Sequence, residues 1–151
     1  MKPAATNGAR LRWIYAAFAV ALLWWDAAQR GNAGAAGAIP DMNDARRIAA
    51  GRRVYDAHCA SCHGANLEGQ ADWRTRRPDG RLPAPPHDDS GHTWHHPFDV
   101  LFAITKHGLV PPHAPADYAS DMPAFGKRLS DEDIWNVLAY IRSRWSDRIR
   151  A

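Results

Sequence analysis

The sequence has few cysteines: Cys59 and Cys62 are its only two. A disulfide between them would close almost no loop and would constrain the chain little. No third or fourth cysteine is present to complete a zinc site with two matched ligand pairs. These absences exclude a disulfide scaffold and disfavour structural zinc, so this cysteine pair needs another explanation.

The sequence also lacks a net charge in residues 39–151, where the folded domain is expected. Four of the 19 Lys and Arg residues and one of the 16 acidic residues lie before residue 39, so 15 of each remain in residues 39–151. A nucleic-acid-binding domain would carry a basic face. The formal charge of +3 therefore belongs to the N-terminal segment, and no nucleic-acid partner is expected.

Long hydrophobic runs are scarce. Residues 13–25 are uninterruptedly apolar, and residues 11–28 form at best a marginal span, whereas a transmembrane helix needs about 20 apolar residues. Basic residues precede this run and a Gly- and Ala-rich stretch follows it, as in an export signal. We expect residues 1–38 to be either a cleaved signal or a membrane anchor with a linker, and we slightly prefer the anchor. Both alternatives place residues 39–151, as one domain, on the periplasmic side of a bacterial inner membrane.

No segment has the alternating pattern of a β-strand, but three have helical periodicity. The first predicted helix covers residues 44–58, with Asn43 as its cap. The second begins at Pro97 and stops at Gly108. A capping box at Ser130 precedes the third, which is predicted from residue 134 to about residue 145. The fold class is therefore predicted to be all-α, with three main helices.

Two long connections, roughly residues 64–95 and 109–129, are rich in Pro, Gly and Asp. Long structureless loops in a small domain count against a helix assignment unless they have a function. Three modest helices in about 110 residues also bury little apolar area. Both difficulties disappear if the loops wrap a large apolar cofactor.

The cysteines belong to the stretch Cys59-Ala60-Ser61-Cys62-His63, which has the C-x-x-C-H pattern of covalent haem attachment. Residues three apart on a helical turn share a face, so both sulfurs can reach the two vinyl groups of one porphyrin. The next residue, His63, can then ligate the iron. The sequence thus predicts one covalent haem c. A thiol–disulfide oxidoreductase is disfavoured, because its C-x-x-C opens a helix in a βαβ unit, whereas this motif follows a helix.

The second axial ligand of the iron is predicted to be Met122. Pro123 favours an extended conformation at Met122, which turns the side chain away from any helix. Met42 lies before the motif in the expected linker, and the remaining methionine is the N-terminal one. His107 and His113 are the alternatives, and ligation by either would lower the redox potential.

Other residues are expected to support the haem. A metal-ligating imidazole normally donates its second N–H to a nearby acceptor, and the carbonyl of Pro85 or Pro86 could provide one for His63. Side chains with N–H groups could contact the haem propionates, although packing or a solvated loop explains each of them equally well; the candidates are Trp73, Trp94 and Arg81.

These motifs resemble those of class I cytochromes c, specifically the small bacterial monohaem kind. The resemblance covers about residues 44–146 and rests on Gly51-x-x-x-Tyr55-x-x-x-Cys59-x-x-Cys62-His63-Gly64, on Met122-Pro123-Ala124-Phe125 and on Leu138-Ala139-Tyr140-Ile141. It implies a fold in which the first and last helices cross closely, with Gly51 meeting the Tyr140 region. It also implies an exposed haem edge at which redox protein partners exchange electrons.

The chain departs from that family in its long segment of residues 70–96. Four histidines lie within ten residues of this segment: His87, His92, His95 and His96. Clustered histidines can bind Cu or Zn, but they can equally hydrogen-bond to the backbone of a loop.

The function expected from these observations is electron transfer by a monomer that is not itself an enzyme. Two axial protein ligands leave no open position on the iron, and no constellation of acid, base and nucleophile is visible. Two other function classes stay open. One is a haem- or copper-based ligand-binding module, and the other is the haem subunit of a larger periplasmic oxidase or dehydrogenase complex.

Overall fold

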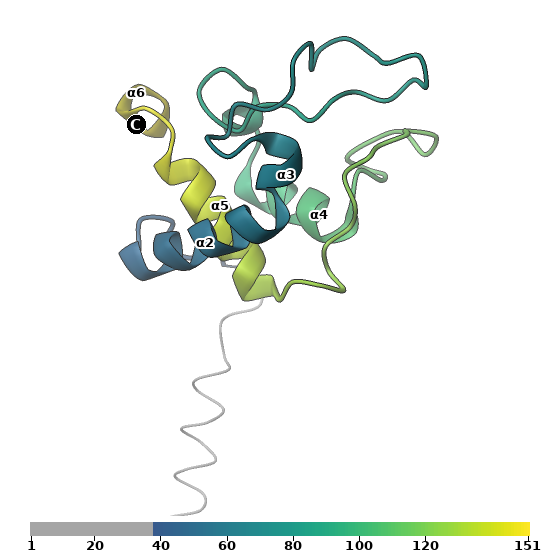
Figure 1. The fold of residues 1–151 in the computed structure, drawn as a ribbon. Coiled ribbons are helices and arrows are strands. Elements are labelled where there is room, and N and C mark those ends of the chain that lie inside the picture. The colour runs from purple at the N-terminus through teal and green to yellow at the C-terminus, as the bar shows by residue number, and fades with distance from the viewer. Residues whose placement is uncertain (1–37) are drawn as a thin grey trace, which may run out of the picture. The chain divides into compact units, whose positions relative to one another are not determined.

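The computed structural model describes residues 38–151, and their compact unit extends from Ile39 to Ala151 (Figure 1). It contains α2 (Ala45–His58), α3 (Ala60–His63), the short 3-10 helix η1 (Thr93–His95), α4 (Phe98–His107), α5 (Asp131–Ser143) and α6 (Asp147–Arg150). No strand occurs within residues 38–151, so the all-α prediction is confirmed.

The three predicted helices correspond to α2, α4 and α5, with small differences at their ends. The cap of α2 is Asp44 rather than Asn43, because the Asp44 carboxylate accepts hydrogen bonds from the backbone N–H groups of Arg46 and Arg47. The capping box of α5 forms between Ser130 and Asp133. Its residues 131–133 already belong to the first helical turn, so α5 starts and ends earlier than the sequence predicted.

Helices α2 and α5 make the most extensive contact in the fold and cross at Gly51 (Figure 1). A Cβ atom on Gly51 would lie 1.8 Å from the backbone oxygen of Asn136 and 2.9 Å from the Cβ of Tyr140. The helices therefore approach so closely that only a hydrogen fits between them, which confirms the crossing implied by the family resemblance.

The apolar core lies on the two sides of α5. One cluster joins α4 and α5 through residues such as Leu101 and Leu138, and the other joins α2 and α5 through Tyr55 and Val137. Met42, which the sequence analysis assigned to a linker, is only 7% exposed and belongs to the first cluster. That assignment was wrong, because an apolar side chain just before α2 can fold back onto the core.

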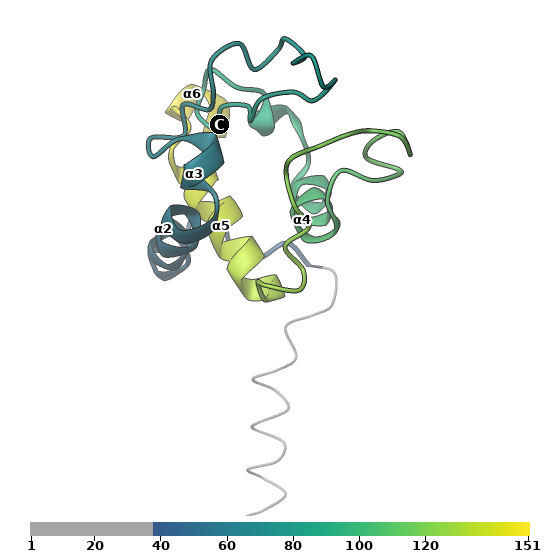
Figure 2. The same ribbon diagram turned by 45° about the vertical axis from the view of Figure 1, so that its right-hand side comes forward.

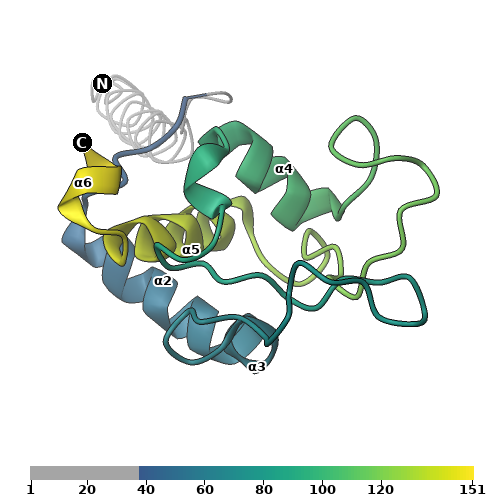
Figure 3. The same ribbon diagram turned by 90° about the horizontal axis from the view of Figure 1, so that it is seen from above.

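Most of the described residues outside the helices lie in the two long connections that the sequence predicted, and η1 lies near the end of the first. One runs from α3 to η1 and the other from α4 to α5, and both extend to the same side of the helices (Figures 1 and 3). In Figure 2, α3, α5, α4 and these two loops are arranged around a common centre. No helix within residues 38–151 is long and apolar enough to span a membrane, and the marginal span of residues 11–28 lies outside the described residues.

Candidate functional site

The two cysteines lie on the turn that follows α2. Cys59 caps the end of α2, and the backbone N–H groups of Cys62 and His63 both donate to the Cys59 carbonyl, at 3.1 and 2.9 Å. Both thiols are free, and Cys62 is exposed. This helical turn puts the two sulfurs on one face, as attachment to a single porphyrin requires.

The Cys59 thiol is poorly suited to redox exchange. Burial, together with the neighbouring Cys62, raises its pKa to about 12. A thiol that stays protonated at neutral pH is a weak nucleophile, because thiol–disulfide exchange proceeds through the thiolate. The raised pKa of Cys59 therefore disfavours a catalytic disulfide at this pair.

His63 is buried, with 7% of its surface exposed, and its orientation is fixed by a backbone carbonyl. Its Nδ1 lies 2.8 Å from the Pro85 oxygen, so Nδ1–H donates there and the lone pair of Nε2 stays available. Burial lowers the pKa of His63, although the hydrogen bond to Pro85 acts in the opposite direction. A neutral imidazole with one ring nitrogen held and the other free is the form that ligates a metal.

A second imidazole lies against the first. The rings of His63 and His87 are stacked with centroids 3.9 Å apart, and His87 Nδ1 is 2.8 Å from the Thr93 hydroxyl. Burial and the nearby rings of His63 and His92 hold the pKa of His87 well below its usual range. His87 is therefore neutral at physiological pH and adds no positive charge beside His63. The sequence analysis did not anticipate this stacking, because the two residues are 24 positions apart.

Met122 lies in the second long loop, in a half-buried position against the cluster that contains Leu101 and Phe125. Its backbone N–H donates to the Ser120 hydroxyl at 3.0 Å. Of the two alternative ligands, His107 is exposed at the end of α4 and His113 is half-buried further along the loop.

Trp94 and Arg81 differ in the partners that the protein gives them. Trp94 stacks on His95, and its indole Nε1 is buried without a hydrogen-bond partner. A buried donor without a partner is costly, so it indicates a missing acceptor. The Nε of Arg81 is also buried without a hydrogen-bond partner, but its guanidinium group lies within ion-pair distance of Asp79 and Asp121.

The four histidines of the long segment contact aromatic neighbours, and two of them contact each other. His87 stacks on His63, His92 on Trp73 and His95 on Trp94, whereas the ring of His96 packs edge-on against that of His92, with centroids 5.4 Å apart. Within residues 38–151, no group of three metal-ligating side chains is close enough to hold an ion. The described residues thus do not form the second metal site that the clustering in sequence suggested, because three of the four rings stack on other aromatic side chains instead of converging on one point.

Comparison with known proteins identifies the family. The cytochrome c family matches residues 48–145, a range that includes the cysteine motif, His63 and Met122. The chain belongs to the cytochrome c family. A similar curated protein is the gluconate 2-dehydrogenase cytochrome c subunit of Pantoea cypripedii, which is 30% identical over 101 residues. That alignment covers 67% of this chain and 21% of the relative, so the chain spans about a fifth of the relative's length. No solved structure matches the chain significantly.

The family match confirms the class I cytochrome c prediction and, with it, the cofactor and the function. The cytochrome c domain carries a covalent haem c with its iron and transfers electrons. The residues fit this group, since Cys59 and Cys62 are free thiols, His63 is a neutral imidazole with one free ring nitrogen, and the indole N–H of Trp94 lacks an acceptor.

Proposed function

We propose that this chain is a one-electron carrier without catalytic activity of its own, in which Cys59 and Cys62 hold the haem and His63 and Met122 ligate its iron. When bound, the haem supplies a ferric–ferrous couple. The observation that carries this assignment is the 2.8 Å contact between His63 Nδ1 and the Pro85 carbonyl. This contact fixes the tautomer of His63 and directs Nε2 away from the backbone.

The surroundings of His63 support the role of a rigid ligand. Its own carbonyl accepts a hydrogen bond from Gly69 at 2.7 Å, and the Tyr55 hydroxyl donates to the carbonyl of Gly64 at 2.9 Å. Tyr55 is fully buried between α2 and α5. The turn that carries His63 is therefore tied to the helix crossing, which keeps reorganisation small when the charge on the iron changes.

Met122 is proposed as the opposite ligand because of its position in the family match and its half-buried loop. A neutral thioether stabilises ferrous iron relative to ferric iron, so ligation by His and Met gives a higher potential than ligation by two histidines. His107 and His113 stay the alternatives until the ligand is measured.

Trp94 and Arg81 are proposed as contacts of the haem propionates. Trp94 offers the stronger case, because its buried Nε1–H has no acceptor and no charged partner competes for it. Asp79 and Asp121 already pair with the guanidinium group of Arg81, so a propionate would have to share this group with two carboxylates.

Replacing Trp94 with Phe should test the indole contact. The change keeps an aromatic ring for stacking on His95 and removes only the donor. Loss of a donor leaves more negative charge at the propionate, which stabilises ferric iron, so the potential should fall. A hydrogen bond to a charged group contributes about 1.5–3 kcal/mol, and its upper end corresponds to roughly 130 mV in a one-electron couple, which sets the upper bound of the shift. Potentiometric titration measures the shift; an unchanged or raised potential would remove Trp94 from the proposed contacts.

A second, more specific function is favoured by the relative from Pantoea cypripedii, which is a cytochrome c subunit of a dehydrogenase. We propose that this chain likewise exchanges electrons with a larger dehydrogenase or oxidase, either as a subunit or as a separate partner. Copurification from a detergent extract distinguishes the two: a stable complex indicates a subunit, and a monomer in gel filtration indicates a diffusing carrier.

We also propose that the domain functions on the periplasmic side of a bacterial inner membrane, as residues 1–38 predict. Haem attachment outside the cytoplasm is the expected consequence. Fractionation of cells that express the full chain should find the haem protein either in the soluble periplasmic fraction or bound to the membrane, which decides between a cleaved signal and an anchor.

The central test is the full chain expressed with haem-maturation machinery. We expect one haem per chain that resists acid–acetone extraction, a one-electron redox titration and, in the ferric protein, the weak far-red band of methionine–iron ligation. Covalent haem without that band would favour ligation by His107 or His113, or an open axial position. An open axial position would favour a ligand-binding function. No covalent haem would refute the assignment of Cys59 and Cys62.

A further inference from the structure

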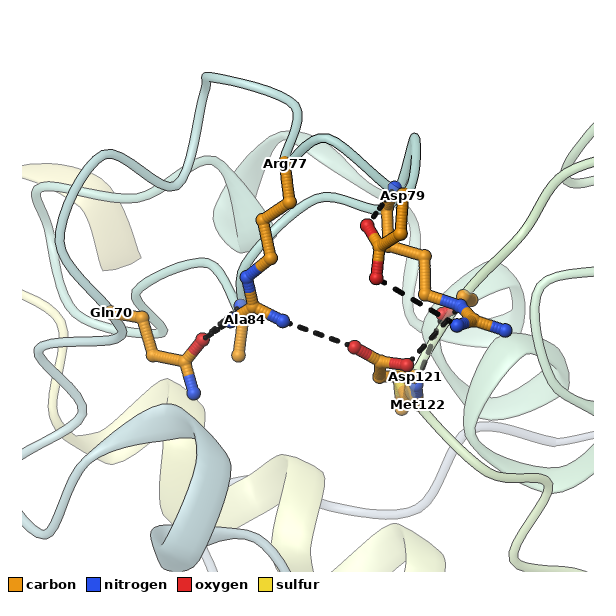
Figure 4. Close-up of polar contacts among 8 residues, drawn as sticks. Gln70, Arg77, Asp79, Ala84, Asp121 and Met122 are labelled. Carbon is orange, nitrogen blue, oxygen red and sulfur yellow. Dashed lines mark hydrogen bonds and ion pairs between the residues drawn. The ribbon is translucent and has the colours of Figure 1, made fainter.

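The loop between α3 and η1 is closed on itself near its middle. Gln70 N–H donates to the Ala84 carbonyl, and Arg77 N–H donates to the Arg81 carbonyl, each at 2.9 Å. The Gln70 side-chain oxygen accepts from the Arg77 guanidinium at 2.8 Å and from the Ala84 N–H at 3.2 Å (Figure 4). Arg77 and Arg81 therefore project from a segment whose two sides are already held together.

The base of this loop contacts His63. Gly69 N–H donates to the His63 carbonyl at 2.7 Å, and the Pro85 carbonyl lies 2.8 Å from Nδ1 of the same residue. A Cβ on Gly69 would come within 2.4 Å of the Pro86 nitrogen, so the two ends of the loop are in tight contact there. Residues 69–86 thus begin and end beside the proposed proximal ligand.

The far part of the same loop contacts the residue before Met122. Arg77 Nη1 donates to Asp121 Oδ2 at 3.2 Å, and Arg81 Nε lies 3.2 Å from Asp121 Oδ1 (Figure 4). One carboxylate is thereby shared by two guanidinium groups that come from a distant part of the chain. The long segment that departs from the family pattern is what provides both arginines.

We infer that residues 69–86 form a brace between the two axial ligands, in which Asp121 is a positioning residue that restrains Met122 on the iron. The inference rests on the proposed ligation by Met122. An external ligand displaces Met122 more easily when the Met122 segment can move away from the iron, and that movement either breaks both ion pairs of Asp121 or is confined by them. The brace therefore makes replacement of Met122 by an external ligand less favourable.

The expected effect of the two ion pairs on ligand exchange depends on how exposed their side chains are. The side chains of Arg77, Arg81 and Asp121 are 41%, 43% and 54% exposed, so a single pair among them would contribute little. Two pairs to one carboxylate from a closed loop require less additional ordering. We expect their combined effect on ligand exchange to be about three- to tenfold.

Imidazole titration of the ferric holoprotein tests the brace, because imidazole binds the iron only where Met122 has left it. Asp121→Asn should bind imidazole about three- to tenfold more tightly than the wild type. Asp121→Glu should restore most of the wild-type value. Added salt should raise the imidazole affinity of the wild type toward that of Asp121→Asn and change the variant less.

The matched control is Asp79→Asn. Asp79 is half-exposed and also pairs with Arg81, at 3.8 Å, but it belongs to the brace loop and not to the Met122 loop. Its substitution removes the same charge and should leave imidazole affinity within about twofold of the wild type. Should Asp121→Asn fail to retain haem, Arg77→Gln keeps the second ion pair and should show an intermediate increase.

The outcomes separate this inference from the proposed function. A wild type with the far-red band, combined with unchanged imidazole affinity in Asp121→Asn or Arg77→Gln, overturns the brace and leaves ligation by Met122 intact. An equal increase in Asp79→Asn overturns it too, because a general charge effect would then suffice. A wild type without the band refutes ligation by Met122, and the brace with it.

Discussion

Replacing Met122 with Ala should remove the far-red band of the ferric protein and lower its potential. Axial ligands set haem potentials over a wide range, so the loss of a thioether that favours ferrous iron should cost on the order of 100 mV or more. The reduced variant should also bind carbon monoxide, because one axial position becomes open. Absorption spectra and potentiometric titration measure all three effects.

Met42→Ala provides the matched control for this variant. Met42 is buried at 7% exposure in the same core cluster against which Met122 packs, so its truncation removes a similar volume. It should lower the free energy of unfolding by about 2–4 kcal/mol without moving the far-red band. If Met42→Ala removes the band and Met122→Ala keeps it, the predicted axial ligand is wrong.

The second large effect is expected at the helix crossing. Gly51→Ala adds a Cβ where the backbone oxygen of Asn136 is 1.8 Å away, so α2 and α5 must separate. Alanine has the higher intrinsic helix propensity, and the change would stabilise a solvent-exposed helix. Here overpacking should dominate and lower the free energy of unfolding by about 3 kcal/mol. Denaturant titration of the holoprotein measures the loss.

The control for the crossing is Ala49→Gly, on the exposed side of α2. It removes a Cβ and should lower the free energy of unfolding by about 1 kcal/mol through helix propensity alone. A Gly51→Ala variant that is as stable as the wild type, or more stable, would show that the two helices are not in contact at this position.

The attachment chemistry could be predicted because it is local. Cys59, Cys62 and His63 lie within one helical turn, so their relative placement follows from helix geometry without any knowledge of the fold. The same holds for the helices, whose limits depend on neighbouring residues such as Pro97, Gly108 and Ser130. The error at the start of α2 was a single position, between two residues that can both act as caps.

Contacts between distant segments could not be predicted in the same way. The sequence left Pro85 and Pro86 as equal candidates to hold His63, and the path of the loop places Pro85 there. Asp121 directly precedes the Met122-Pro123-Ala124-Phe125 motif, and Arg77 and Arg81 lie in the divergent segment of residues 70–96. Complementary charge was the available signal, but nothing in the sequence specified which of several arginines would reach the carboxylate.

The sequence by itself determined the covalent haem and the all-α class, because each depends on residues within a few positions of one another. The electron-transfer role followed from the haem motif together with the family resemblance. Only the tertiary structure decided that one loop contacts both His63 and the segment of Met122, that Met42 belongs to the core, and that the four nearby histidines do not form a three-ligand metal site among the described residues. The physical reason is that loop paths depend on many weak, long-range contacts. Their sum becomes definite only when the whole chain is packed.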